Sequence, residues 1–147
     1  MTAASSIVPP AARNASWAST AAAAAIGAAG GLIINSLIAW AGRDLLDVPH
    51  EFRPLSLPVY GALTVLGAII GAIGWRLVAT RSRRATRLLT ALVPAVLVLS
   101  LIPDTLLLAS KSQPGTTGAG VLCLMLMHFG VAAAAVPAYR RFISPQS

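Results

Sequence analysis

Hydrogen-bonding or ionisable side chains interrupt the long apolar runs of this sequence: Ser36 and five candidate site residues, Asn35, Thr64, Ser100, Asp104 and His128. The carboxylate and the imidazole could exchange a proton, and the hydroxyls and the amide could bind a polar ligand. Counted from the ends of the apolar runs at about 1.5 Å per residue, all five lie about 7 to 15 Å from one membrane face. A lone polar group is costly in hydrocarbon, so we expect these side chains to turn toward one another. The sequence therefore predicts a polar pocket in one half of a helical bundle.

Within this predicted pocket, the spacing allows a proton relay. Ser100 and Asp104 are four residues apart and share one helix face, and His128 lies at about the depth of Ser100. Pro103 has no N–H to donate, so it leaves the carbonyl of Leu99 free beside Ser100. One interpretation is a relay from Asp104 through Ser100 to His128. In the other, the polar residues only hydrogen-bond neighbouring helices together, and Asp104 reaches the lipid headgroups.

Other kinds of site have little support in the sequence. His50 and His128 are the only histidines, so a bis-histidine haem would need two chains, and no cluster of zinc ligands exists. The polar connection at 42–57 could hold a hard cation with its carboxylates, but Arg43 and Arg53 favour ion pairs within it. No phosphate-binding loop or nucleophile motif is present. We therefore predict no metal, no cofactor and no enzymatic activity.

The composition indicates the solvent in which these residues lie. Hydrophobic residues make up 56% of the 147 residues and charged residues only 10%, whereas a soluble domain carries about 25% charged residues. Each of four apolar runs is about 20 residues long, enough to cross a hydrocarbon core of about 30 Å. The sequence predicts an all-α integral membrane four-helix bundle with helices at about 17–41, 58–79, 88–109 and 118–139. Residues 1–16 and 142–147 are expected to form flexible cytoplasmic tails.

The placement of arginines predicts the orientation of the bundle. Five of the eleven basic residues fall between the second and third apolar runs: Arg76, Arg81, Arg83, Arg84 and Arg87. Positively charged loops stay on the cytoplasmic side of a membrane. Both termini are therefore predicted inside, and the polar pocket is predicted in the outer half. This orientation places eight basic residues inside and three outside, and we expect a multi-pass protein of the bacterial cell membrane.

The formal charge of +7 does not indicate nucleic acid as a partner. The arginines cluster at the ends of apolar runs and do not follow one amphipathic face. The expected partners are the lipid bilayer and anionic lipid headgroups at the cytoplasmic face. A homo-oligomer or a larger membrane complex is a further expectation.

Glycine pairs predict one contact between helices. In lipid, small residues matter for association because they let two backbones approach closely. Gly27 and Gly31 lie in the first helix, and Gly67 and Gly71 lie in the second at matching depths, with each pair spaced four residues apart. The first and second helices are therefore predicted to meet through these glycines.

Short motifs along residues 20–140 resemble an uncharacterised family of small four-helix membrane proteins common in actinobacteria. The matching features are Asn35, Arg53-Pro54-Leu55, Ser100-Leu101-Ile102-Pro103, and Leu126-Met127-His128 with the Ala-rich run to Pro137. The resemblance implies a four-helix membrane architecture and no assigned activity. Asp104 stands where the resemblance implies an apolar residue or proline, which weakens the proposed relay.

Two functions fit these observations. The first is a structural or accessory membrane protein whose polar residues hold helices together. The alternative is a small carrier or sensor that binds a lipid, a quinone or a proton in the outer polar pocket. The two differ in whether the polar side chains satisfy one another or line a site that is open to a ligand.

Overall fold

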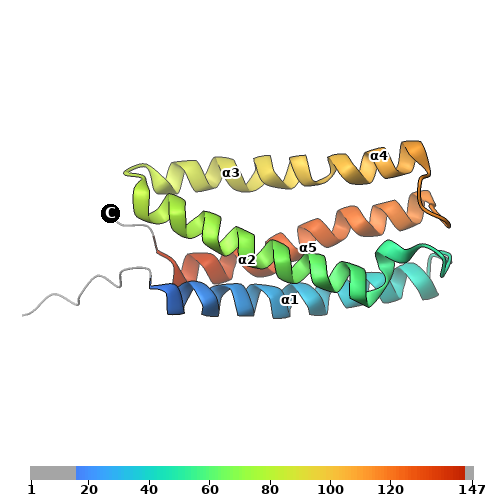
Figure 1. The fold of residues 1–147 in the computed structure, drawn as a ribbon, viewed down its shortest axis with the longest axis horizontal. Helices are drawn as coiled ribbons and strands as arrows, with labels where there is room; N and C mark the ends of the chain where they lie inside the picture. The colour runs from blue at the N-terminus through green and yellow to red at the C-terminus, as the bar shows by residue number, and fades with distance from the viewer. Residues whose placement is uncertain (1–15, 145–147) are drawn as a thin grey trace, which may run out of the picture.

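A computed structural model of the chain describes residues 16–144. Its elements, in order, are α1 (Trp17–Asp44), η1 (Arg53–Leu55), α2 (Leu57–Arg81), α3 (Ala85–Ser100), α4 (Ile102–Ser110) and α5 (Gly118–Phe142). Figure 1 shows four antiparallel rods, in which α3 and α4 together form the third. Within residues 16–144, four stretches are long and apolar enough to cross a membrane, with Ala85–Ser110 counted as one. The predicted all-α four-helix membrane architecture is confirmed.

Helix boundaries differ from the predicted ones in two main respects. The first, second and fourth helices extend further at their C-terminal ends, to Asp44, Arg81 and Phe142. The helix predicted over 88–109 is instead two helices that meet at Leu101, because Pro103 cannot donate a backbone hydrogen bond to the preceding turn. The predicted tails lie outside the described residues, except for residue 16 and residues 142–144.

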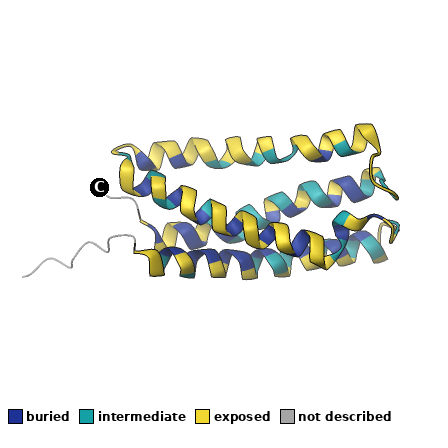
Figure 2. Ribbon diagram, viewed as in Figure 1, coloured by how far each residue is buried: buried dark blue, intermediate teal, exposed yellow. Residues whose placement is uncertain are grey.

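Three of the four spans form the core of the bundle. The most extensive interface joins α1 to α5, and α2 packs on both of them. In these three spans 28–33% of the apolar window is buried, against 6% in the third span. Figure 2 shows the difference as a nearly continuous exposed surface along α3 and α4. The third span is therefore attached loosely to a three-helix core.

The helices α1 and α2 do meet, but not through the four predicted glycines, because Gly27 packs against α5 and Gly31 lies between Thr64 of α2 and Val131 of α5. A Cβ added to Gly27 would lie 3.0 Å from the Cα of Ala135, and one added to Gly31 would lie 3.5 Å from Val131 and 3.0 Å from the Thr64 side chain. The Ala-rich stretch of α5 has small side chains, so two backbones can approach there more closely than at α2.

The two glycines of α2 have different surroundings. A Cβ added to Gly67 would meet nothing within 4 Å, whereas one added to Gly71 would lie 2.8 Å from the Tyr139 hydroxyl of α5. That hydroxyl donates a 2.6 Å hydrogen bond to the carbonyl of Ala68. Gly71 therefore makes room for a polar contact between α2 and α5, and Gly67 faces outward.

Aromatic residues close the end of the bundle that carries the α2–α3 turn, here called the arginine end. The rings of Trp75 and Tyr139 lie 5.7 Å apart, and Trp75 Nε1 donates to the carbonyl of Ile143 at 3.0 Å. Ile143 itself is fully buried. The indole N–H thus fixes the end of α5 against α2.

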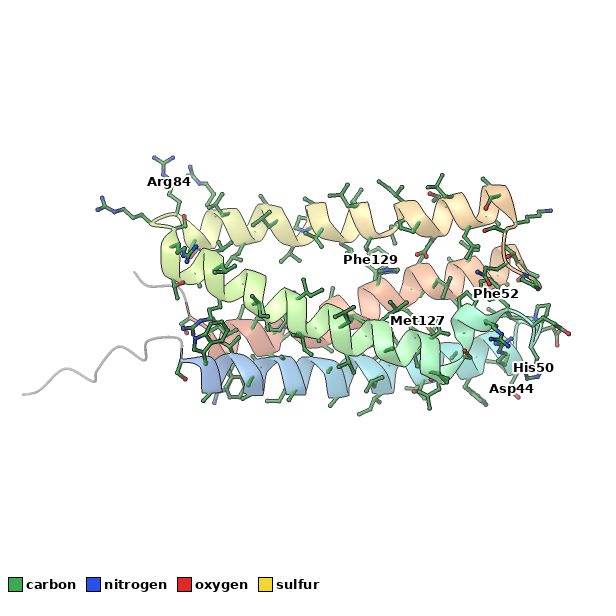
Figure 3. The ribbon with its side chains drawn as sticks, viewed as in Figure 1. Asp44, His50, Phe52, Arg84, Met127 and Phe129 are labelled. Carbon is green, nitrogen blue, oxygen red and sulfur yellow. The ribbon has the colours of Figure 1, made fainter. Side chains whose placement is uncertain are left out.

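A folded loop closes the opposite end, here called the Phe52 end. Figure 3 shows Phe52 and Arg84 at opposite ends of the bundle. The Phe52 ring is fully buried and lies against Gly120 of α5. Arg43 donates to the carbonyls of Val48, Pro49 and Phe52. The ion pairs predicted for this loop do not form among the described residues. Arg43 binds backbone carbonyls instead.

Candidate functional site

The five predicted site residues form two separate pairs and one isolated group. Asn35 Nδ2 donates to Thr64 Oγ1 at 2.8 Å, and His128 Nδ1 lies 3.2 Å from Asp104 Oδ2. Ser100 Oγ donates to the carbonyl of Leu97 in its own helix, at 2.7 Å. The expected single pocket is therefore divided, and no relay passes through Ser100.

Asn35 and Thr64 join α1 to α2 in the interior of the bundle. Their exposed fractions are 2% and 3%. The remaining Asn35 oxygen, Oδ1, has no hydrogen-bond partner, and a Cβ added to Gly130 would approach it to 3.1 Å. The amide is thus enclosed by three helices and holds two of them together. This geometry has no room for a ligand.

Helix rotation keeps Asn35 and His128 apart. Gly130 faces Asn35, and His128 precedes it by two residues. Two residues correspond to about 200° around a helix, so the His128 side chain points away from α1 and toward α4. Depth alone suggested that the polar side chains would converge. The angular positions on α5 could have shown that they would not.

Asp104 and His128 meet although their Cα atoms differ in predicted depth. Each Cα–Cβ bond leans toward the N-terminus of its own helix. The helices α4 and α5 are antiparallel (Figure 1), so the two side chains lean toward each other along the bundle. Asp104 is 7% exposed, and it lies in the first turn of α4. The positive end of the helix dipole there stabilises a carboxylate. The break at Leu101 creates this position.

This pair can hold a proton between two ionisable groups. His128 Nδ1 is hydrogen-bonded to the carbonyl of Leu124 at 2.9 Å, and the nearby Asp104 Oδ2 accepts no hydrogen bond within the described residues. The imidazole N–H therefore has two acceptors within reach. Within residues 16–144, the pair is the one polar contact between the third span and another helix. No group of three metal-binding side chains occurs in the same range.

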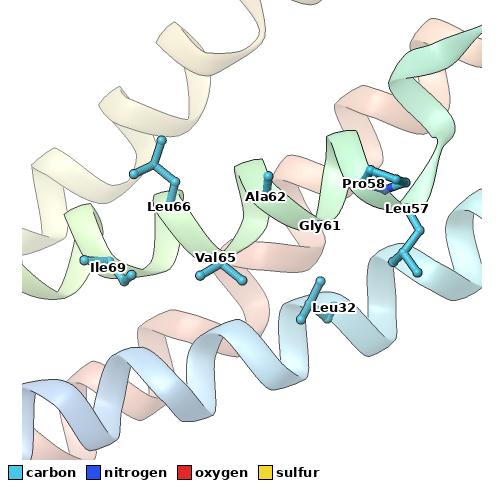
Figure 4. A pocket seen from close by; sticks show the side chains of 8 residues that line it. All are labelled: Leu32, Leu57, Pro58, Gly61, Ala62, Val65, Leu66 and Ile69. Atoms are coloured by element: carbon cyan, nitrogen blue, oxygen red, sulfur yellow. The ribbon is translucent and has the colours of Figure 1, made fainter.

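An apolar groove lies between α1 and α2 on the surface of the bundle. It has a volume of about 490 Å³ and is lined by Leu32 and by residues of α2 from Leu57 to Ile69. Figure 4 shows that its walls are aliphatic, apart from the open position at Gly61. None of the five predicted site residues lines it. A hydrocarbon chain fits this surface better than a polar ligand does.

The five topology arginines fall into two groups. The Arg76 guanidinium lies 4.4 Å from the centre of the Trp17 ring and 3.4 Å from Thr20 Oγ1, so it holds the start of α1. The other four are exposed: Arg81, Arg83, Arg84 and Arg87. In Figure 3, Arg84 points away from the bundle. Arg76 therefore has a packing role that its place in a basic loop did not reveal.

Besides the hydrogen bond between the Ser36 and Tyr60 hydroxyls at 3.0 Å, the sequence analysis missed the polar contacts of Trp75 and Tyr139. Both carry a polar tip on a large ring, and such tips find a hydrogen-bond partner when they are buried. Both bond to a backbone carbonyl across an interface of the core. The available signal was a Tyr and a Trp inside long apolar runs.

Residues 10–144 match the model of a family described as a family of unknown function, DUF6069. No curated protein matches the chain, and no solved structure does.

Proposed function

Because the chain belongs to DUF6069, a family of unknown function, we propose from its geometry that this membrane protein has a structural or accessory role. The observation that supports this proposal is the state of its polar side chains. Asn35 binds Thr64, and Tyr139 binds the carbonyl of Ala68. Hydrogen bonds of this kind between neighbouring helices stabilise helix packing.

The arrangement of the spans fits an accessory subunit. The closely packed core of α1, α2 and α5 supplies a rigid frame. The third span presents large exposed apolar side chains, among them Val96, Leu99 and Leu106. A homo-oligomer or a larger membrane complex would be built on that face, while lipid covers it in the monomer.

Substitution of His128→Leu, together with mass spectrometry of extracts, tests the structural role. We expect the purified wild-type protein to carry no stoichiometric quinone or other cofactor. We also expect His128→Leu to lower the melting temperature in detergent, because Asp104 loses its partner. A co-purifying cofactor that disappears in a variant with wild-type melting would contradict the structural role.

A second function, a proton-responsive element, is supported by the Asp104–His128 contact alone. An ionisable pair inside a membrane span is costly, and such pairs often serve proton movement. Hydrogen exchange of α4, measured at about pH 5 and about pH 8, tests this function. We expect the protection factors of the α4 amides, corrected for the intrinsic exchange rate at each pH, to change with pH in the wild type and to lose that dependence in His128→Gln. Equal pH dependence in both proteins would exclude the pair as the responsive group.

A further inference from the structure

Four arginines at the α2–α3 turn have no bonding partner for their guanidinium groups within the described residues. We call this group of Arg81, Arg83, Arg84 and Arg87 the arginine corner. All four are exposed, and neither a hydrogen bond nor an ion pair engages their guanidinium groups. Arg76, one turn before the corner, is by contrast held by Trp17 and Thr20. The corner therefore presents four unneutralised positive charges in a stretch of seven residues.

No acidic side chain lies beside the arginine corner within residues 16–144. Its four acidic residues are Asp44, Asp47, Glu51 and Asp104. The first three lie in or beside the loop at the Phe52 end, and Asp104 faces His128. No acidic side chain therefore balances the charge of the corner, and an anion from another molecule can do so.

The corner lies at the level of the lipid headgroups. The 25 residues of α2 span about 37 Å, which exceeds a hydrocarbon core of about 30 Å. The turn that follows α2 is therefore placed in the polar layer of one leaflet. This placement does not depend on which leaflet is cytoplasmic.

Exposed leucines lie next to the arginine corner, on the side of the hydrocarbon core. Leu77 precedes Arg81 by one turn of α2, and Leu88 and Leu92 follow Arg87 on α3; all three are more than 40% exposed. Guanidinium groups bind phosphate oxygens through paired hydrogen bonds, and the leucines offer an apolar surface directly below. A phosphate joined to acyl chains matches both parts.

We propose that the arginine corner binds the headgroup of an anionic phospholipid, with the acyl chains along Leu77, Leu88 and Leu92. This site is separate from the polar pairs in the spans and does not depend on the proposed structural role. Its chemistry excludes zwitterionic lipids as equal ligands, because their headgroups carry no net negative charge.

Lipid titration of the full chain in neutral detergent, followed by native mass spectrometry, tests the proposal. We expect phosphatidylglycerol to bind more tightly than phosphatidylcholine. The double variant Arg83→Gln/Arg84→Gln should bind phosphatidylglycerol about 10- to 30-fold more weakly. The matched control, Arg53→Gln/Lys111→Gln, removes two exposed positive charges from the Phe52 end and should bind like the wild type.

Several outcomes would overturn the proposal. One is equal binding of the two lipids by the wild type; another is an equal loss in both double variants, which would indicate net charge alone. Inorganic phosphate at about 10 mM should leave phosphatidylglycerol bound, because it has no acyl chains to occupy the leucines. Displacement by phosphate would identify a site for free phosphate instead. Melting curves show whether each variant folds. Arg83→Lys/Arg84→Lys keeps the charge but cannot form paired hydrogen bonds to phosphate, so it should bind more weakly than the wild type and more tightly than Arg83→Gln/Arg84→Gln.

Discussion

Gly67 and Gly71 lie one helical turn apart on α2 and serve different purposes. Gly67 faces open space, and Gly71 lies under the hydroxyl of Tyr139. The absence of a side chain is needed only where another helix approaches. At Gly71 it lets the tyrosine reach the carbonyl of Ala68, and at Gly67 it only weakens the helix.

Alanine at these two positions should have different effects on the free energy of unfolding. Gly71→Ala places a Cβ within 2.8 Å of the Tyr139 hydroxyl, so we expect a loss of about 1 kcal/mol of unfolding free energy as the hydrogen bond is displaced. Gly67→Ala should leave the stability unchanged or raise it by up to about 1 kcal/mol. Thermal unfolding in one detergent compares the two. Equal effects would mean that Tyr139 does not depend on Gly71.

The third span differs from the other elements in how it is attached. Its first half is held by Ala85 and Leu89, the two buried residues of α3. Its second half, α4, has Asp104 as its one buried residue. The break at Leu101 separates these halves, so α4 can move without disturbing α3.

The rate of amide hydrogen exchange should differ between α4 and the core helices. We expect the amides of α4 to exchange faster than those of α1 and α5, because few contacts hold α4 in place. His128→Leu should raise the exchange of α4 further while leaving α1 unchanged. Protection in α4 equal to that in α5 would show that the third span is an integral part of the core.

At the scale of the whole molecule, the charge distribution is one-sided. Arginines collect at the end with the α2–α3 turn, and Asp44, Asp47 and Glu51 collect at the other. The predicted orientation places the arginine end in the cytoplasm. This orientation remains a prediction of the sequence, because the structure of the bundle is compatible with either orientation in the membrane.

Labelling of single cysteines decides the orientation. In a background with Cys123 replaced, cysteines at Ser82 and Ser144 should react only from the cytoplasmic side, and one at Ser112 only from outside. Reaction of the Ser82 position with an impermeant reagent in intact cells would reverse the topology.

The spans could be predicted from the sequence, but their partners could not. Bilayer thickness fixes the length of an apolar helix, so α1, α2 and α5 were placed to within a few residues. Which helices pack together depends on the rotation of each helix about its axis and on small side chains such as that of Ala135. The depth of a residue in the membrane determines neither. The two polar pairs illustrate this: Asn35 and His128 lie at similar depth on surfaces of the bundle that do not meet.

Because α1 packs mainly against α5, the core of the bundle can form only after the last span has been synthesised. A ribosome delivers α1 first and α5 last. Until the final span inserts, Gly27 and Gly31 have no alanine surface to cover them, and Phe52 has no Gly120 to close against. A nascent chain that stops before Gly118 holds its first hairpin mainly through Asn35–Thr64 and the Ser36–Tyr60 hydrogen bond. Such unfinished chains should be recognised and degraded by membrane proteases more readily than finished ones.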